Sequence, residues 1–137
     1  MPTQFEIILR LVLAAILGGA IGAQREWTGK PAGLRTLSLL GLGSALFAVV
    51  SAWAFPGGTP TQIAAGVVTG IGFLGAGAIL HRHGGVEGLT TAAAIWVTAG
   101  MGLAVGTGMY LISIVVTVLV LIIFFIPHIP PRNNNRH

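Results

Sequence analysis

The stretch GIGFLGAGAIL (residues 70–80) is the part of the sequence that decides the fold class. It begins with G-x-G-x-x-G, the fingerprint of a dinucleotide-binding turn whose glycines let the backbone approach a pyrophosphate. That turn needs a preceding strand, a helix start open to water and an acidic residue about 20 positions further on. Residue 92 is an alanine, and Glu87 is the only acid downstream. The same spacing is typical of helices that pack closely inside a membrane, and we expect such a helix here.

The composition agrees with a membrane location. Only 7% of the 137 residues are charged, against roughly a quarter in a typical soluble domain. The chain has no aspartate, and its acids are Glu6, Glu26 and Glu87. A soluble fold cannot cover its surface with so few charges, so we expect an all-α integral membrane protein. The absence of cysteine excludes disulfides and thiolate catalysis, and no basic face with aromatic stacking surfaces indicates nucleic-acid binding.

Five apolar segments approach the length of about 20 residues that a membrane-spanning helix needs. They cover about 5–23, 37–55, 62–80, 90–106 and 109–126, and the breaks between them are rich in Gly, Pro and polar residues. Residues 90–126 as one helix would be about 55 Å long, so two spans are expected there. The prediction is one transmembrane domain over 1–127, followed by a flexible basic cytoplasmic tail over 128–137.

The positive-inside rule gives the orientation. Five spans place every loop Lys and Arg on one side: Arg25, Lys30, Arg35, Arg82, Arg132 and Arg136. We therefore expect the N-terminus outside and the C-terminus in the cytoplasm. The opening MPTQFE lacks the basic start of a cleaved signal peptide, which favours an uncleaved first span.

Glycines recur at the spacing that lets membrane helices approach closely. The predicted packing positions are Gly18, Gly22, Gly66, Gly70, Gly72, Gly75, Gly77, Gly102 and Gly106. These residues predict a compact bundle of the first four spans, although they could also pack against a partner's helices. The third span has small residues on several faces, so we expect it at the centre, with residues 70–80 the most crowded segment. The fifth span has bulky side chains all round and is expected at the lipid-facing edge.

Glu6 and Arg10 are four residues apart, the spacing of an ion pair on one helix face. A charge inside a membrane span is a functional hypothesis by default. The simpler interpretation is that both side chains snorkel to the outer interface as a neutral pair.

A second polar group lies on the predicted inner face and is a candidate polar network or docking site for a partner. Its members are Arg25, Glu26, Arg35, Arg82, Glu87 and Thr90. The simpler interpretation is an orientation signal in contact with anionic lipid headgroups, with Thr90 and Thr91 capping a helix. No set of His, Cys and acids predicts a metal site, and no nucleophile with a base predicts catalysis or a bound cofactor.

Three segments, GKPAGLRT (29–36), TGIGFLGAGAI (69–79) and GLTTAAAIWVTAGMGLAVGTGMY (88–110), carry a family resemblance. Through them, about residues 5–126 resemble the MgtC/SapB family of bacterial inner-membrane proteins. The family's characteristic residues fall on Arg25, Gly33, Leu34, Arg35, Thr36, Gly70, Gly72, Phe73, Leu74, Gly75, Gly77, Gly88, Thr90, Thr91, Ala92 and Trp96. Gln24 and Glu87 depart from the usual acid and base at those positions. Many members continue into a cytoplasmic domain, whereas this chain stops at PPRNNNRH, so we expect the membrane module alone.

The resemblance implies a multi-pass protein associated with growth in low magnesium and with virulence. It implies a regulator of other membrane proteins more than a magnesium transporter. The first hypothesis is therefore a non-enzymatic protein that binds a membrane-protein partner or a second copy of itself within the lipid bilayer. The second is an ion transporter, for Mg²⁺ or another cation, or a carrier of small solutes.

Overall fold

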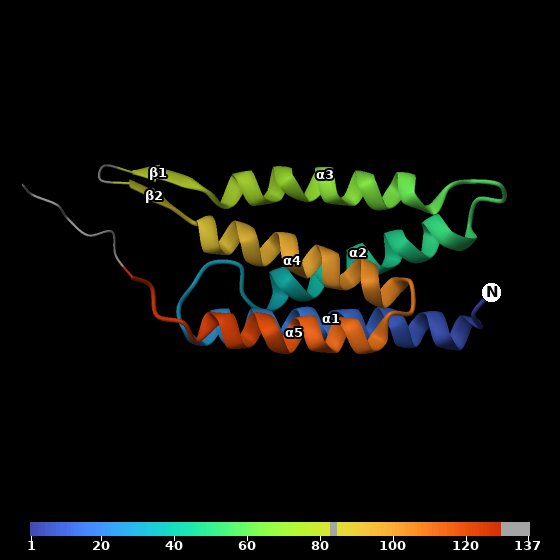
Figure 1. The fold of residues 1–137 in the computed structure, drawn as a ribbon, viewed down its shortest axis with the longest axis horizontal. Coiled ribbons are helices and arrows are strands. Elements are labelled where there is room, and N and C mark those ends of the chain that lie inside the picture. The colour runs from blue at the N-terminus through green and yellow to red at the C-terminus, as the bar shows by residue number, and fades with distance from the viewer. Residues whose placement is uncertain (83–84, 130–137) are drawn as a thin grey trace, which may run out of the picture.

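The structure is a computed structural model and describes residues 1–82 and 85–129. It is an elongated bundle of five helices with one small β-hairpin (Figure 1). The helices are α1 (Gln4–Trp27), α2 (Leu34–Trp53), α3 (Pro60–Ala78), α4 (Leu89–Gly106) and α5 (Tyr110–Phe124). The antiparallel strands β1 (Leu80–Arg82) and β2 (Gly85–Glu87) form the hairpin in a segment for which the sequence predicted a loop.

Four helices, α1 to α4, are long and apolar enough to cross a membrane. The fifth, α5, is apolar but only 15 residues long. Figure 1 places the N-terminus at one end of the bundle and the hairpin, with the end of α5, at the opposite end. We call these the N-terminal end and the hairpin end.

Glycines with a positive φ make two tight connections. Gly88 (φ +90°) precedes α4, and a Cβ there would collide with the carbonyl oxygen of Ala78, so only glycine fits. Gly108 (φ +90°) turns the chain between α4 and α5. Gly88 is the N-cap of α4 and makes no side-chain capping bond. The expectation that Thr90 and Thr91 cap this helix is therefore wrong.

Helices α1, α2 and α4 form the packed core, because their glycines let the backbones approach closely. A Cβ added at Gly22 would lie 2.5 Å from the carbonyl oxygen of Gly33, and one at Gly102 would lie 2.5 Å from that of Gly41. Gly18 and Gly106 face α2 in the same way. Buried side chains fill the space around these crossings: Ala14, Ile21, Leu37, Ala45, Ile95, Met101 and Val105.

Helix α3 does not lie at the centre of the bundle. Only 6% of its apolar window is buried, against 33% to 50% in α1, α2 and α4. A Cβ at Gly66, Gly70, Gly72 or Gly77 would meet no atom within 4 Å, and Gly75 touches Ala92 at an ordinary distance. The prediction that residues 70–80 are the most crowded segment is therefore wrong for the single chain. Small residues permit close packing on α3, but the helix packs on the core through Val67, Ile71 and Ala78 and leaves most of its glycines open.

Candidate functional site

Arg10 is buried near the N-terminal end of the bundle and joins four helices. Its Nη1 donates to the carbonyl oxygen of Gly106 (2.9 Å), its Nε to Tyr110 Oη (2.8 Å) and its Nη2 to Glu6 Oε1 (2.8 Å). The guanidinium carbon lies 5.2 Å from the centre of the Trp53 ring, within range of a cation–π contact. The side chain is only 8% exposed, so it turns into the bundle rather than snorkelling outward. Glu6 remains half exposed beside it.

Arg25 is buried at the hairpin end and is held by neutral acceptors. Its Nε donates to the carbonyl oxygen of Pro31 (3.0 Å), and its Nη2 donates to Thr91 Oγ1 in the first turn of α4. The Phe124 ring covers the guanidinium at 5.5 Å. Arg25 is 3% exposed, and its described hydrogen-bond acceptors carry no charge.

Helices α1 and α4 run antiparallel, and the two arginines of α1 contact α4 with the same spacing. Arg10 and Arg25 are fifteen residues apart on α1, and their acceptors Gly106 and Thr91 are fifteen residues apart on α4. Fifteen residues of helix measure about 22 Å, less than the roughly 30 Å of hydrocarbon that a span crosses. Each guanidinium therefore lies near one boundary of a centred bilayer, and together they fasten α1 to α4 at both ends.

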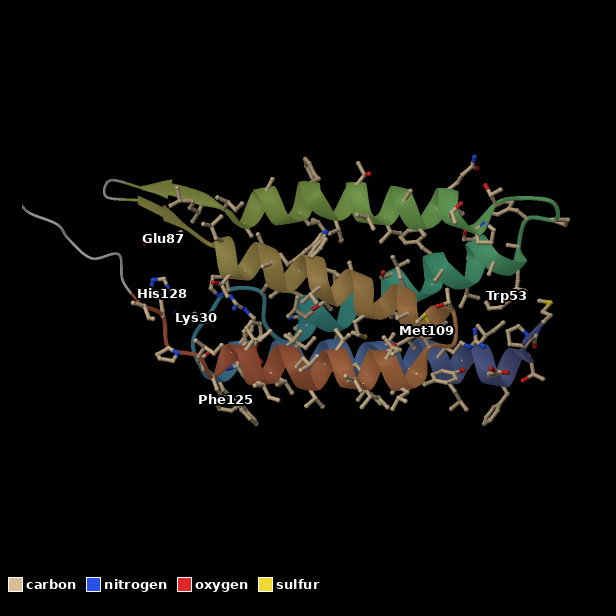
Figure 2. All side chains as sticks on the ribbon, viewed as in Figure 1. Lys30, Trp53, Glu87, Met109, Phe125 and His128 are labelled. Carbon is tan, nitrogen blue, oxygen red and sulfur yellow. The ribbon has the colours of Figure 1, made fainter. Side chains whose placement is uncertain are left out.

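The other predicted inner-face residues gather at the same end without joining Arg25. Glu26 is exposed near the end of α1 beside Gly33, and Arg35 and Thr90 are exposed in the first turns of α2 and α4. Glu87 is exposed in β2, at the hairpin end that Figure 2 shows. The backbone of Arg82 lies in β1, but its side chain is outside the described part of the structure. His83 also lies outside it.

The sequence predicted the ion pair of Arg10 with Glu6, which is confirmed, but not the other partners of the two arginines. Tyr110 and Trp53 stand at helix ends on the predicted outer side, where Arg10 also lies, so the topology could have indicated them. Capping is the simpler interpretation of Thr91 from the sequence, although the same topology places it on the side of Arg25. Thr98, in the middle of α4, has a buried hydroxyl without a hydrogen-bond partner within residues 1–82 and 85–129.

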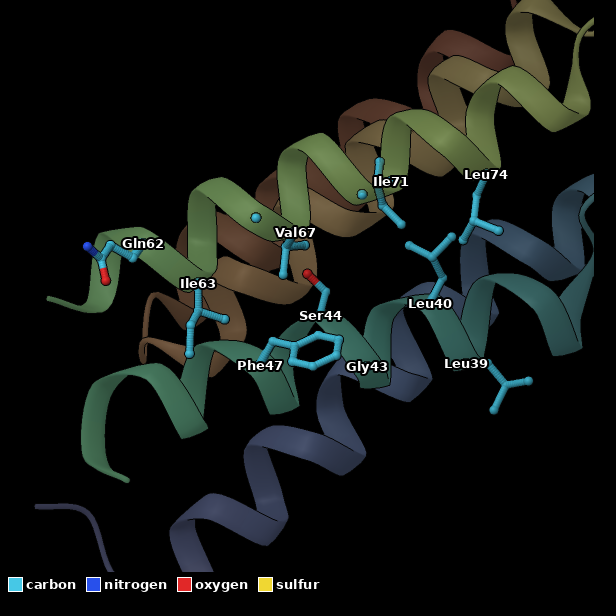
Figure 3. Close-up of a pocket in the computed structure, with 12 residues that line it drawn as sticks. Leu39, Leu40, Gly43, Ser44, Phe47, Gln62, Ile63, Val67, Ile71 and Leu74 are labelled. Carbon is cyan, nitrogen blue, oxygen red and sulfur yellow. The ribbon is translucent and has the colours of Figure 1, made fainter. Parts of the chain in front are cut away.

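A groove between α2 and α3 opens to the outside of the bundle (Figure 3). Its volume is about 700 Å³, and its lining is apolar apart from Ser44 and Gln62. Ser44 Oγ already donates to the carbonyl oxygen of Ala99 (2.5 Å). Gly43, Gly66 and Gly70 form part of its wall. Within the described ranges, no three His, Cys, Asp or Glu side chains gather as metal ligands.

Comparison with known proteins gives the family. The model of the MgtC family matches residues 11–129, nearly the whole described structure. The chain belongs to the MgtC family. The resemblance seen in the sequence is thereby confirmed, and the MgtC region contains both arginine-bound ends of α4 and the whole α2–α3 groove.

Two MgtC-family relatives show how much of the longer proteins this chain represents. It is 51% identical to YhiD of Escherichia coli K12, over 96% of this chain and 66% of YhiD. It is 44% identical to MgtC of Salmonella typhimurium LT2, over 86% of this chain and 51% of MgtC. The chain thus spans about two thirds of the one and half of the other. YhiD bears a provisional name as a magnesium transporter. No solved structure matches this chain significantly.

Proposed function

We propose that this chain is a non-enzymatic regulatory module of the bacterial inner membrane that acts in magnesium homeostasis by binding helices of membrane proteins. The observation that carries the proposal is the row Gly66, Gly70 and Gly77 on one face of α3, where an added Cβ would meet no atom within 4 Å in the described part of the chain. Association in lipid depends on close backbone approach, which glycine permits. This face therefore suits the transmembrane helix of another molecule. We propose that this chain itself has five spans, with its C-terminus in the cytoplasm.

The hairpin end of the bundle provides polar groups that could also contact the partner protein. Glu26, Arg35 and Thr90 are exposed at the hairpin end and are available to a cytoplasmic loop of a partner. Arg10 and Arg25, in contrast, are committed to internal acceptors and fasten α1 to α4. Since intramembrane charges in transporters usually mark the path of the substrate, this use of both arginines favours a rigid binding platform.

Transport of Mg²⁺ or another cation is the second candidate, because the name of the relative YhiD describes that activity. Hard cations take several oxygen ligands, usually including carboxylates. The three carboxylates of this chain lie away from the middle of every helix: Glu6 and Glu26 in the end turns of α1, and Glu87 in β2. The residues thus support binding of a partner better than coordination of a cation.

The test combines a flux measurement with a growth assay. Purified protein in liposomes is expected to give no Mg²⁺ flux above that of empty liposomes. In a bacterium that lacks its own copy, the chain is expected to restore growth at limiting magnesium, and Gly70→Leu is expected to abolish this. Val118→Leu, on the exposed face of α5, is the matched control and should restore growth. Protein-dependent Mg²⁺ flux, or full growth with Gly70→Leu at equal protein level, would overturn the proposal.

A further inference from the structure

Four of the five glycines of α3 have no structural use within the described part of the chain. Gly18, Gly22 and Gly41 meet backbone atoms of a neighbouring helix, and Gly19 meets side chains of α2. Four of the five α3 glycines, in contrast, meet nothing within 4 Å. Glycine weakens a helix relative to alanine, because it has more freedom to lose. A helix with so many glycines therefore gains from them only if another backbone comes close.

Contact with lipid alone does not call for such a surface. Helix α5 has no glycine or alanine, and after Tyr110 its exposed side chains are Leu, Ile and Val, such as Leu111, Val118 and Ile122. In this chain, the helix expected to face lipid therefore presents bulky apolar side chains. Helix α3 is as exposed as a lipid-facing helix but has the composition of a packed one.

The open glycines of α3 continue the groove between α2 and α3. Gln62, Gly66 and Gly70 follow one another at four-residue intervals and lie along one face of α3, and all three line the groove. Figure 3 shows Gly43 of α2 on the opposite wall, and a Cβ at Gly43 would also meet nothing within 4 Å. A helix can therefore approach both walls closely.

We propose that a second copy of this chain occupies this face, α3 against α3, about a two-fold axis normal to the membrane. The proposal rests on the role of the α3 face given above and names its partner. Close approach needs small residues on both helices, and in the described part of the chain α3 is the helix whose glycine row is unoccupied. Two-fold pairing is the commonest way in which a surface meets its own copy.

The polarity of the groove also fits a second copy. Its lining is uncharged, so it requires no partner of opposite charge. Gln62 is exposed, and its amide carries both a donor and an acceptor. Two copies inserted in the same orientation hold Gln62 at the same depth, so each amide provides what the other needs. An acyl chain offers such an amide neither a donor nor an acceptor.

The absence of cysteine makes a direct test simple. Gly66→Cys places a thiol where a Cβ meets nothing in the chain, so the monomer should fold. Oxidation in native membranes is expected to link two copies, whereas Val118→Cys on α5 should stay monomeric. Adding Gly70→Leu to the Gly66→Cys variant should make the disulfide-linked fraction fall about tenfold. Gly72→Leu is the matched control: Gly72 also meets nothing but does not line the groove, so the dimer should persist.

Several outcomes would overturn the dimer. They are equal cross-linking at residues 66 and 118, no cross-link at 66, an unchanged dimer with Gly70→Leu, and a cross-link from 66 to a different protein. The last outcome would leave the proposed function standing with another partner. Conversely, Mg²⁺ flux from a protein that dimerises through α3 would overturn the proposed function and leave the dimer intact.

Discussion

Adding one methyl group to α4 should show how much of the fold depends on close helix approach. Gly102 and Gly100 are two residues apart on this helix. A Cβ at Gly102 would lie 2.5 Å from the carbonyl oxygen of Gly41 and 2.8 Å from the Cβ of Ser44, whereas one at Gly100 would meet nothing within 4 Å. Gly100→Ala thus changes the helix propensity alone, and Gly102→Ala changes the packing as well.

The magnitude follows from these distances. To restore an ordinary contact, α2 must move away from α4 by roughly 1 Å, which strains a packed core by about 1–3 kcal/mol. The same movement stretches the bond from Ser44 Oγ to the carbonyl oxygen of Ala99, which contributes about 1 kcal/mol. Alanine returns up to about 1 kcal/mol of helix propensity. Gly102→Ala should therefore lower the free energy of unfolding by about 1–3 kcal/mol, and Gly100→Ala should leave it equal or slightly higher.

The assay is reversible unfolding of the purified protein in mixed micelles, with increasing fractions of denaturing detergent and helix content as the signal. Both variants are compared with the parent chain at one low protein concentration, so that association does not contribute. The reasoning is refuted if Gly102→Ala is as stable as Gly100→Ala, because the backbones of α2 and α4 would then not be in contact at this crossing.

Three further substitutions test the polar contacts. Arg10→Gln should lower the free energy of unfolding by about 1–3 kcal/mol in the same assay, because the buried carbonyl of Gly106 loses its donor. Arg25→Lys should cost a similar amount, since an ammonium cannot reproduce the guanidinium fork that reaches both Thr91 and the 28–33 loop; an unchanged unfolding curve would contradict this. Arg35→Ala should change stability by less than about 0.5 kcal/mol yet weaken growth at limiting magnesium, and unchanged growth would remove Arg35 from the docking surface.

The sequence predicted the helices well, because apolar segments of nearly membrane length are separated by breaks with clear turn chemistry. It predicted less well where each helix ends. Gln24 to Trp27 were assigned to a loop, yet α1 continues through Trp27, since Arg25 is buried against α4. The hairpin over residues 80–87 was read as a loop, because three-residue strands are too short to give an alternating pattern.

The position of α3 could not be predicted, for a physical reason. A row of glycines indicates that a helix face tolerates a close neighbour, but it does not indicate which helix that neighbour is. Gly18 and Gly66 stand in rows of the same kind, yet one faces α2 and the other is open. What distinguishes them is tertiary: α1, α2 and α4 cross with Gly18 turned toward α2, whereas α3 packs on α4 and α2 with Gly66 turned toward open space.

The two buried arginines explain how the chain can leave α3 outside its core. A helix bundle in lipid gains little from hydrophobic burial, so its stability rests on close packing and on polar contacts between helices. Arg10 and Arg25 place such contacts at both ends of the α1–α4 pair. Close backbone approaches at glycines pack α2 against both of these helices. Within the described part of the chain, no side chain of α3 forms a hydrogen bond to these helices. The one polar link is the backbone carbonyl of Pro60, which accepts from Ser51 Oγ. A frame that is complete without α3 leaves the glycines of α3 free for another molecule, and this is why we place the binding surface there rather than on the better-packed helices.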